Sequence, residues 1–157
     1  MIAQLAAALT GTIGFALLYG VPRHFYPTCG IIGMLGWGLY LLLEPLIHAT
    51  FATAAATVLV AFLSRLLAVV WKCPATIFMI CGLFPLIPGG GIYWTTYYLV
   101  IGEQNQALAT GYGALKAAVA IVLGIVFTSI LPQAFFGRAA RPLCRLTGRI
   151  QAKWKSR

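Results

Sequence analysis

Long apolar stretches, separated by short polar or proline-containing stretches, run along most of this chain. A helix that crosses a membrane needs about 20 mainly apolar residues. Such stretches cover residues 2–19, 28–43, 48–70 and 108–136, and a further apolar stretch at 73–102 is interrupted near its middle. The pattern predicts an all-α protein, a polytopic membrane helix bundle.

The composition supports lipid as the solvent for much of the surface. Of the 157 residues, 61% are hydrophobic and 8% are charged, and the mean hydropathy is +0.93. Soluble domains carry charge on about a quarter of their positions. This chain has too little charged surface for a soluble domain of its length.

The interrupted stretch is the most informative part of the sequence. Residues 73–84 would form a helix of only ~18 Å, at a rise of 1.5 Å per residue. Two prolines, Pro85 and Pro88, lack an N–H and obstruct the preceding turn. Three glycines follow them and give the backbone freedom and room for close approach. We predict a discontinuous fourth helix, broken at Pro85–Gly91, with a second half-helix over 92–101.

Loop charges predict the topology. Cytoplasmic loops of membrane proteins carry an excess of Lys and Arg. Five crossings with the N-terminus outside place every loop charge on the side that this rule predicts. The cytoplasmic side receives Arg23, Arg65, Lys72 and the C-terminal tail, and the outer side receives Glu44, His48 and Glu103. This assigns residues 1–137 to a transmembrane helical domain and 138–157 to a basic cytoplasmic tail.

The tail contains seven of the eleven basic residues: Arg138, Arg141, Arg145, Arg149, Lys153, Lys155 and Arg157. We expect it to bind anionic lipid headgroups, at about 1 kcal/mol for each charge near the surface. Nucleic acid is not an expected partner, because the basic residues are not spread over a polar folded surface.

Glycines recur at helical spacing in the first two apolar stretches. They are Gly11 and Gly14, and then Gly30, Gly33 and Gly36. Small residues let helix backbones approach closely in lipid. We expect contacts between helices here, within the chain or with a partner chain.

The predicted break offers a binding site for a small molecule. The first half-helix ends in carbonyl groups, its partly negative end, and the second begins with unpaired N–H groups, its partly positive end. Broken membrane helices use such ends to hold carboxylates and cations. The predicted substrate-binding residues include Pro88, Gly89, Gly90, Gly91, Tyr93, Thr96 and Tyr97. The alternative is a structural kink packed against its neighbours.

Lys116 is the other costly residue, because an ammonium within a membrane helix must pair or reach water. We include it among the substrate-binding candidates as a counter-charge for a carboxylate. Two alternatives stay open: its side chain reaches up to the interface, or it pairs with a partner chain.

Other chemistry has little support in the sequence. His24 and His48 have no acidic or sulfur neighbours that would complete a metal site. The cysteines are scattered, without metal-ligand spacing. There is no arrangement typical of a catalytic triad, and three glycines without a Walker lysine do not form a nucleotide site. We expect no cofactor and no enzyme activity.

Several motifs resemble one known family, the threonine/serine exporters. The resemblance extends over residues 10–135. It is carried by residues 14–16 (GFA), 20–23 (GVPR), 29–37 (CGIIGMLGW), 72–78 (KCPATIF) and above all 84–93 (FPLIPGGGIY).

The resemblance implies a small subunit similar to the C-terminal half of a single-chain exporter, with a second membrane subunit supplying the other half. It implies export of threonine or serine driven by the proton motive force, or export of a dicarboxylate such as succinate. It also implies a location in the plasma (inner) membrane of a prokaryote. Two further hypotheses are a scaffold subunit that does not transport and a homo-oligomeric channel.

Overall fold

The structure, a computed structural model, describes residues 2–131. The predicted basic tail, 138–157, lies outside the described residues. Every regular element within 2–131 is helical. In chain order the elements are α1 (Ile2–Leu18), η1 (Arg23–Phe25), α2 (Tyr26–Leu43), α3 (Ala49–Trp71), α4 (Ala75–Leu83), η2 (Phe84–Leu86), α5 (Gly89–Val100) and α6 (Gln104–Ile130).

Three stretches are long and apolar enough to cross a membrane: η1 with α2, then α3, then α6. The pair formed by α4–η2 and α5 meets the same criteria together, with a bend of 50° between its two parts. α1 is apolar but shorter, at 17 residues. The predicted membrane helix bundle is confirmed, and the prediction of five crossings is compatible with these helices.

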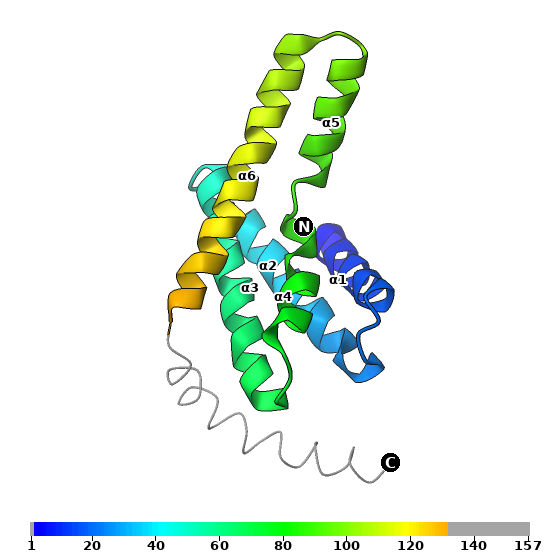
Figure 1. The fold of residues 1–157 in the computed structure, drawn as a ribbon, viewed down its shortest axis with the longest axis vertical. Coiled ribbons are helices and arrows are strands. Elements are labelled where there is room, and N and C mark those ends of the chain that lie inside the picture. Colours follow the sequence, from blue (N-terminus) through cyan, green and yellow to red (C-terminus); the bar gives the residue numbers. More distant parts are fainter. Residues whose placement is uncertain (1, 132–157) are drawn as a thin grey trace.

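The helices form two parts (Figure 1). α1, α2, α3 and α4 pack together as one group, which we call the four-helix group. α5 packs chiefly against the first half of α6, and this antiparallel pair, the α5–α6 hairpin, extends beyond the four-helix group. The second half of α6 lies along α3. α6 therefore joins the two parts.

Glycines bring the helices of the four-helix group into close contact. A Cβ added at Gly33 of α2 would collide with Thr12 of α1, and one added at Gly36 would collide with Val60 of α3. On α4, a Cβ at Gly82 would lie 2.7 Å from Cγ2 of Ile32. Dispersion and small residues, rather than the hydrophobic effect, hold helices together in lipid. The predicted packing role of the α2 glycines is thus confirmed within this chain.

α6 differs from its predicted range at both ends. It begins at Gln104 rather than at residue 108, because its first turn is polar and the predicted range included only the apolar residues. It ends at Ile130 rather than at 136, because Leu131 has an extended backbone, with ψ 126°. Leu131 precedes Pro132, and the proline ring disfavours helical geometry in the residue before it.

Arg65 of α3 holds the end of α6. Its Nη1 donates to the carbonyl oxygens of Thr128, at 2.6 Å, and Leu131, at 3.2 Å. The last carbonyls of a helix have no partner within the helix, and a cation is favourable there. We had counted Arg65 only among the cytoplasmic charges, and the structure gives it this further role.

Candidate functional site at the helix break

The predicted break is present but shorter than predicted, and proline geometry explains its position. The second half-helix covers Gly89–Val100 rather than 92–101, so the three glycines belong to its first turn. α4 passes into the short η2 turn, Ile87 is extended with ψ 127°, and α5 begins at Gly89. Ile87 precedes Pro88, which disfavours helical geometry at Ile87. Pro85 is tolerated because it lies in the first turn of η2, where its missing N–H is not needed. The two half-helices meet at 50°.

The first turn of α5 presents backbone N–H groups. The N–H of Gly89 donates to the carbonyl of Ile87 at 2.7 Å, and Pro88, the N-cap residue, makes no side-chain capping bond. The N–H groups of Gly90 and Gly91 have no partner inside the helix, as in every first turn. This turn is therefore the partly positive end that the sequence predicted.

The three glycines at the break differ in what surrounds them. None has a positive φ, so the backbone freedom that we expected of them is not used. A Cβ added at Gly91 would lie 3.1 Å from Cβ of Ala114, so Gly91 lets α5 approach α6. Nothing lies within 4 Å of a Cβ added at Gly89 or Gly90. These two glycines leave the first turn of α5 open to another molecule.

Tyr93, Thr96 and Tyr97 lie on the side of α5 that faces away from α6. The side that faces α6 is marked by Gly91 and Thr95, whose Oγ1 is 3.1 Å from that of Thr110. At about 100° per residue, Gly89, Tyr93 and Thr96 lie on the opposite side of the helix. Tyr93 is 64% exposed, and α5 buries none of its residues.

These hydroxyl groups are arranged within an aromatic cluster. Trp94 contacts Tyr93 and Tyr97 edge to face, with ring centroids 5.4 and 5.6 Å apart, and stacks on Tyr98 at 5.8 Å. The hydroxyl of Thr96 donates to the carbonyl of Ile92 at 3.0 Å. The open glycines and the exposed Tyr93 and Tyr97 together form the outer face of α5.

The structure does not bring Lys116 to this face. Ala114 is the residue of α6 that meets Gly91, and Lys116 lies about 200° further round α6. Its ammonium lies 4.5 Å from the centre of the Tyr112 ring on that far side. The sequence placed Lys116 within two residues of Ala114, the position of α6 that meets the break. It could not show which side of α6 would pack on α5.

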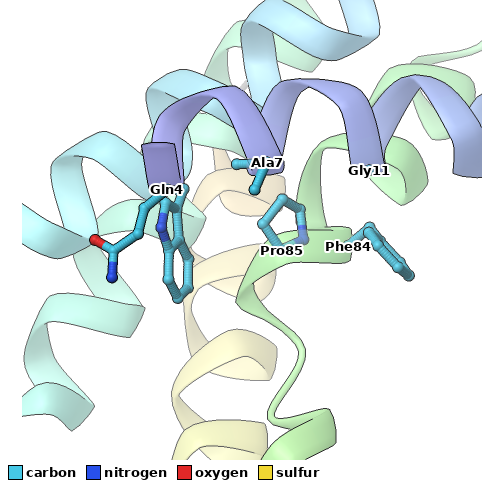
Figure 2. A pocket seen from close by; sticks show the side chains of 7 residues that line it. Gln4, Ala7, Gly11, Phe84 and Pro85 are labelled. Atoms are coloured by element: carbon cyan, nitrogen blue, oxygen red, sulfur yellow. The ribbon is translucent and has the colours of Figure 1, made fainter. Parts of the chain in front are cut away.

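A cavity beside the break is lined by residues that we did not single out from the sequence. It has a volume of about 250 Å³ and lies between α1, α2 and η2. In Figure 2, Phe84 and Pro85 lie beside α1, near Ala7 and Gly11. Gln4 and Trp37 supply polar groups to an otherwise apolar lining that also includes Ala7, Ala8, Gly11, Phe84 and Pro85. The sequence feature that could have indicated this cavity is a glutamine, Gln4, inside the first apolar stretch.

Metal-binding residues do not gather in the part of the chain that the structure describes. No three side chains of His, Cys, Asp or Glu within 2–131 are placed to hold one ion. Cys29 and Cys81 are buried in the packed core, and Cys73 is partly buried.

Comparison with known proteins gives one result. The sequence profile of the threonine/serine exporter family, ThrE, matches residues 4–131. Neither the curated proteins nor the solved structures contain a significant match. The matched region covers α1 from residue 4 onward and all of α2 to α6, with both half-helices and the break between them.

Proposed function

The chain belongs to the threonine/serine exporter family, a family of membrane transporters, and we propose that it is one subunit of a secondary exporter of small carboxylate-bearing metabolites. The substrate binds at the outer face of α5. Its carboxylate accepts hydrogen bonds from the first-turn N–H groups of Gly90 and Gly91. Tyr93, Thr96 and Tyr97 orient the rest of the molecule.

The observation that carries this proposal is the open space at Gly89 and Gly90. At helix contacts of the four-helix group, neighbouring side chains fill the space beside each glycine. Nothing lies within 4 Å of a Cβ added at Gly89 or Gly90. Backbone N–H groups left without partners in hydrocarbon cost several kcal/mol each, so such backbone occurs only where it is buried or lines a wet cavity. A bound carboxylate satisfies the N–H groups and is itself favoured by the helix dipole.

Threonine and serine are the substrates we favour, because a zwitterion uses both ends of the break. The carboxylate binds the first turn of α5, and the ammonium lies toward the carbonyl end of α4 and η2, which is partly negative. A dicarboxylate such as succinate would use only the positive end. Comparing the export of labelled threonine, serine and succinate from the same vesicles decides between these two substrate classes.

A second membrane subunit completes the site. α5 buries none of its residues, and its outer face has no covering helix in the described part of the chain. In the plasma membrane of a prokaryote the N-terminus lies outside and the tail inside, and α4, η2 and α5 form one broken crossing. The proton motive force drives export, and the coupling acid lies in the second subunit. Neither Glu44 nor Glu103, the only acids of this chain, lies in a predicted membrane-spanning stretch.

The test uses both subunits reconstituted in vesicles. Gly89→Ala with Gly90→Ala places two methyl groups over the first turn of α5 while leaving the contact of Gly91 with Ala114 intact. We expect export driven by a proton gradient to fall at least about tenfold, which corresponds to 1.4 kcal/mol.

Gly14→Ala is the matched control. Gly14 is also helical and has nothing within 4 Å of an added Cβ, but it lies in α1. Its variant should export at the rate of the unchanged protein. Full export by the Gly89/Gly90 variant would refute the assignment of the site.

A further inference from the structure

One side of α6 carries a stripe of exposed apolar side chains with a single cation near its beginning. The residues follow one another at intervals of three or four, which places them on one side of a helix. They are Tyr112, Lys116, Val119, Leu123, Phe127 and Ile130, and we call them the Lys116 stripe. Lys116 is the only charged residue in α6.

The C-terminal part of the stripe borders a groove between α6 and α3. The groove has a volume of about 370 Å³ and is almost wholly apolar, with Ala54 and Val58 on the α3 side. It shares Leu123, Phe127 and Ile130 with the stripe. The groove and the stripe therefore form one continuous surface.

Close approach of the two helices fixes the shape of this groove. A Cβ added at Gly124 would lie 2.8 Å from Cβ of Thr57 and 3.1 Å from the carbonyl oxygen of Ala54. Near the end of α6, Arg65 holds the carbonyls of Thr128 and Leu131. A groove fixed at both points is preformed, which lowers the entropic cost of binding a partner.

No carboxylate within residues 2–131 pairs with Lys116. Glu103 lies about 20 Å away along α6, at 1.5 Å per residue, and it accepts a hydrogen bond from Gln106. Glu44 accepts a hydrogen bond from Tyr40 on α2. The ammonium of Lys116 lies over the Tyr112 ring, itself 63% exposed. An ammonium within a membrane helix is expected to face another polar group.

We propose that the Lys116 stripe and the α3–α6 groove form the docking surface for a transmembrane helix of the second subunit, and that this helix carries a carboxylate facing Lys116. This inference rests on the proposed function in so far as it requires a second subunit. Apolar side chains of that helix fill the groove beside Leu123 and Phe127. The carboxylate sets the register of the helix against α6, because only one position places it beside Lys116.

The location separates docking from substrate binding. The stripe is on the side of α6 opposite to α5, so the helix docked there does not itself cover the outer face of α5, which another part of the second subunit completes. The charge balance supports an acidic partner, because the chain has eleven basic and two acidic residues. A second copy of this chain would bring only those two acids to the surface.

A hydrophobic carbodiimide applied to native membranes tests the contact directly. It condenses an amine with a carboxylate in contact with it: the C–N bond of an amide forms, the oxygen of the carboxylate passes to the carbodiimide, and a urea leaves. We expect digestion and mass spectrometry to find Lys116 joined to an Asp or Glu of a membrane peptide from another chain. The Lys116→Gln variant should lose this link.

Charge reversal provides the second measurement. With the second subunit co-expressed, Lys116→Glu should lower its recovery with the tagged chain at least about tenfold. Exchanging the linked acid of the partner for lysine should restore it. Lys72→Glu is the control, because Lys72 is the C-cap residue of α3 and belongs neither to the stripe nor to the lining of the groove, and we expect recovery to stay unchanged.

Three results would overturn the inference. A link from Lys116 to Glu44 or Glu103 of a second copy would make the surface a contact between copies. The absence of any link, with full recovery of the partner by Lys116→Glu, would show that Lys116 reaches lipid phosphate instead. A link that survives in Lys116→Gln would come from another residue. None of these measurements depends on transport, so a linked complex without export would refute the proposed function and leave the docking surface intact.

Discussion

The four-helix group and the α5–α6 hairpin use the same residue type in opposite ways. In the four-helix group, Gly33 and Gly36 of α2 lie against Thr12 and Val60 so closely that a methyl group would collide with them. In the hairpin, Gly89 and Gly90 face open space. A glycine in a membrane helix therefore permits close approach, and its surroundings tell whether the same chain fills the space beside it.

Burial shows the same difference. The core of the four-helix group contains fully buried residues from α2, α3 and α4, among them Cys29, Val60 and Phe78. α5 contains none. Regions that bind ligands or move usually have few buried contacts. The contrast separates a packed base from an exposed surface, and the exposed surface is where we propose that substrate and the second subunit bind.

The largest expected effect is on the four-helix group itself. Gly33→Ala and Gly36→Ala each force a methyl group into a filled space, and overpacking of this kind costs about 1–3 kcal/mol at each site. We expect the double variant to unfold at a clearly lower temperature in detergent, as followed by fluorescence-detected size exclusion. If it is as stable as Gly14→Ala, whose methyl group meets nothing, the helices are not packed as the structure shows.

The next effect concerns the attachment of α6 to α3. Arg65→Gln removes a charged donor from the carbonyls of Thr128 and Leu131, and hydrogen bonds to charged groups contribute about 1.5–3 kcal/mol. We expect faster hydrogen exchange at the end of α6 and a lower unfolding temperature. Arg65→Lys keeps the charge and should recover part of the loss. Equal exchange in all three proteins would contradict the capping role.

A smaller effect is expected inside the hairpin. Thr95→Val removes the contact between the hydroxyls of Thr95 and Thr110, and hydrogen bonds between membrane helices are worth about 0.6 kcal/mol on average. A double-mutant cycle with Thr110→Val measures the coupling between the two residues. Thr96→Val is the control, because the hydroxyl of Thr96 bonds within α5. A coupling of zero would mean that α5 and α6 do not meet at this position.

The smallest effect on stability is expected where the effect on export is largest. Gly89→Ala and Gly90→Ala add methyl groups to open space in a helical backbone, and alanine is the better helix former by about 0.8–1.0 kcal/mol in helix interiors. We therefore expect unchanged or slightly higher stability. Gly91→Ala, which meets Ala114 at 3.1 Å, should be the less stable single variant. The same thermal assay compares all three, and the reverse order would contradict the comparison between the glycines.

The sequence by itself determined the fold class and the location of the break. Apolar stretches of spanning length, with so few charges, fit only a helix bundle in lipid. Pro88 forced the chain out of helical geometry at Ile87, the residue before it, as local steric rules require. Pro132 also ended α6 earlier than we expected, so the sequence contained that signal although our apolar criterion passed over it.

Only the tertiary structure decided which faces meet. Ala114 and Lys116 are only two residues apart, yet Ala114 faces Gly91 and Lys116 faces away from it. The rotation of α6 that decides this is set by its contacts with α3 and α5. The contact of α5 with α6 distinguished Gly91 from Gly89 and Gly90. The packing of α1 and α2 against η2 brought Gln4 and Trp37 beside the break from helices far away in sequence. Periodicity gives the faces of each helix, whereas packing between helices chooses the partner of each face.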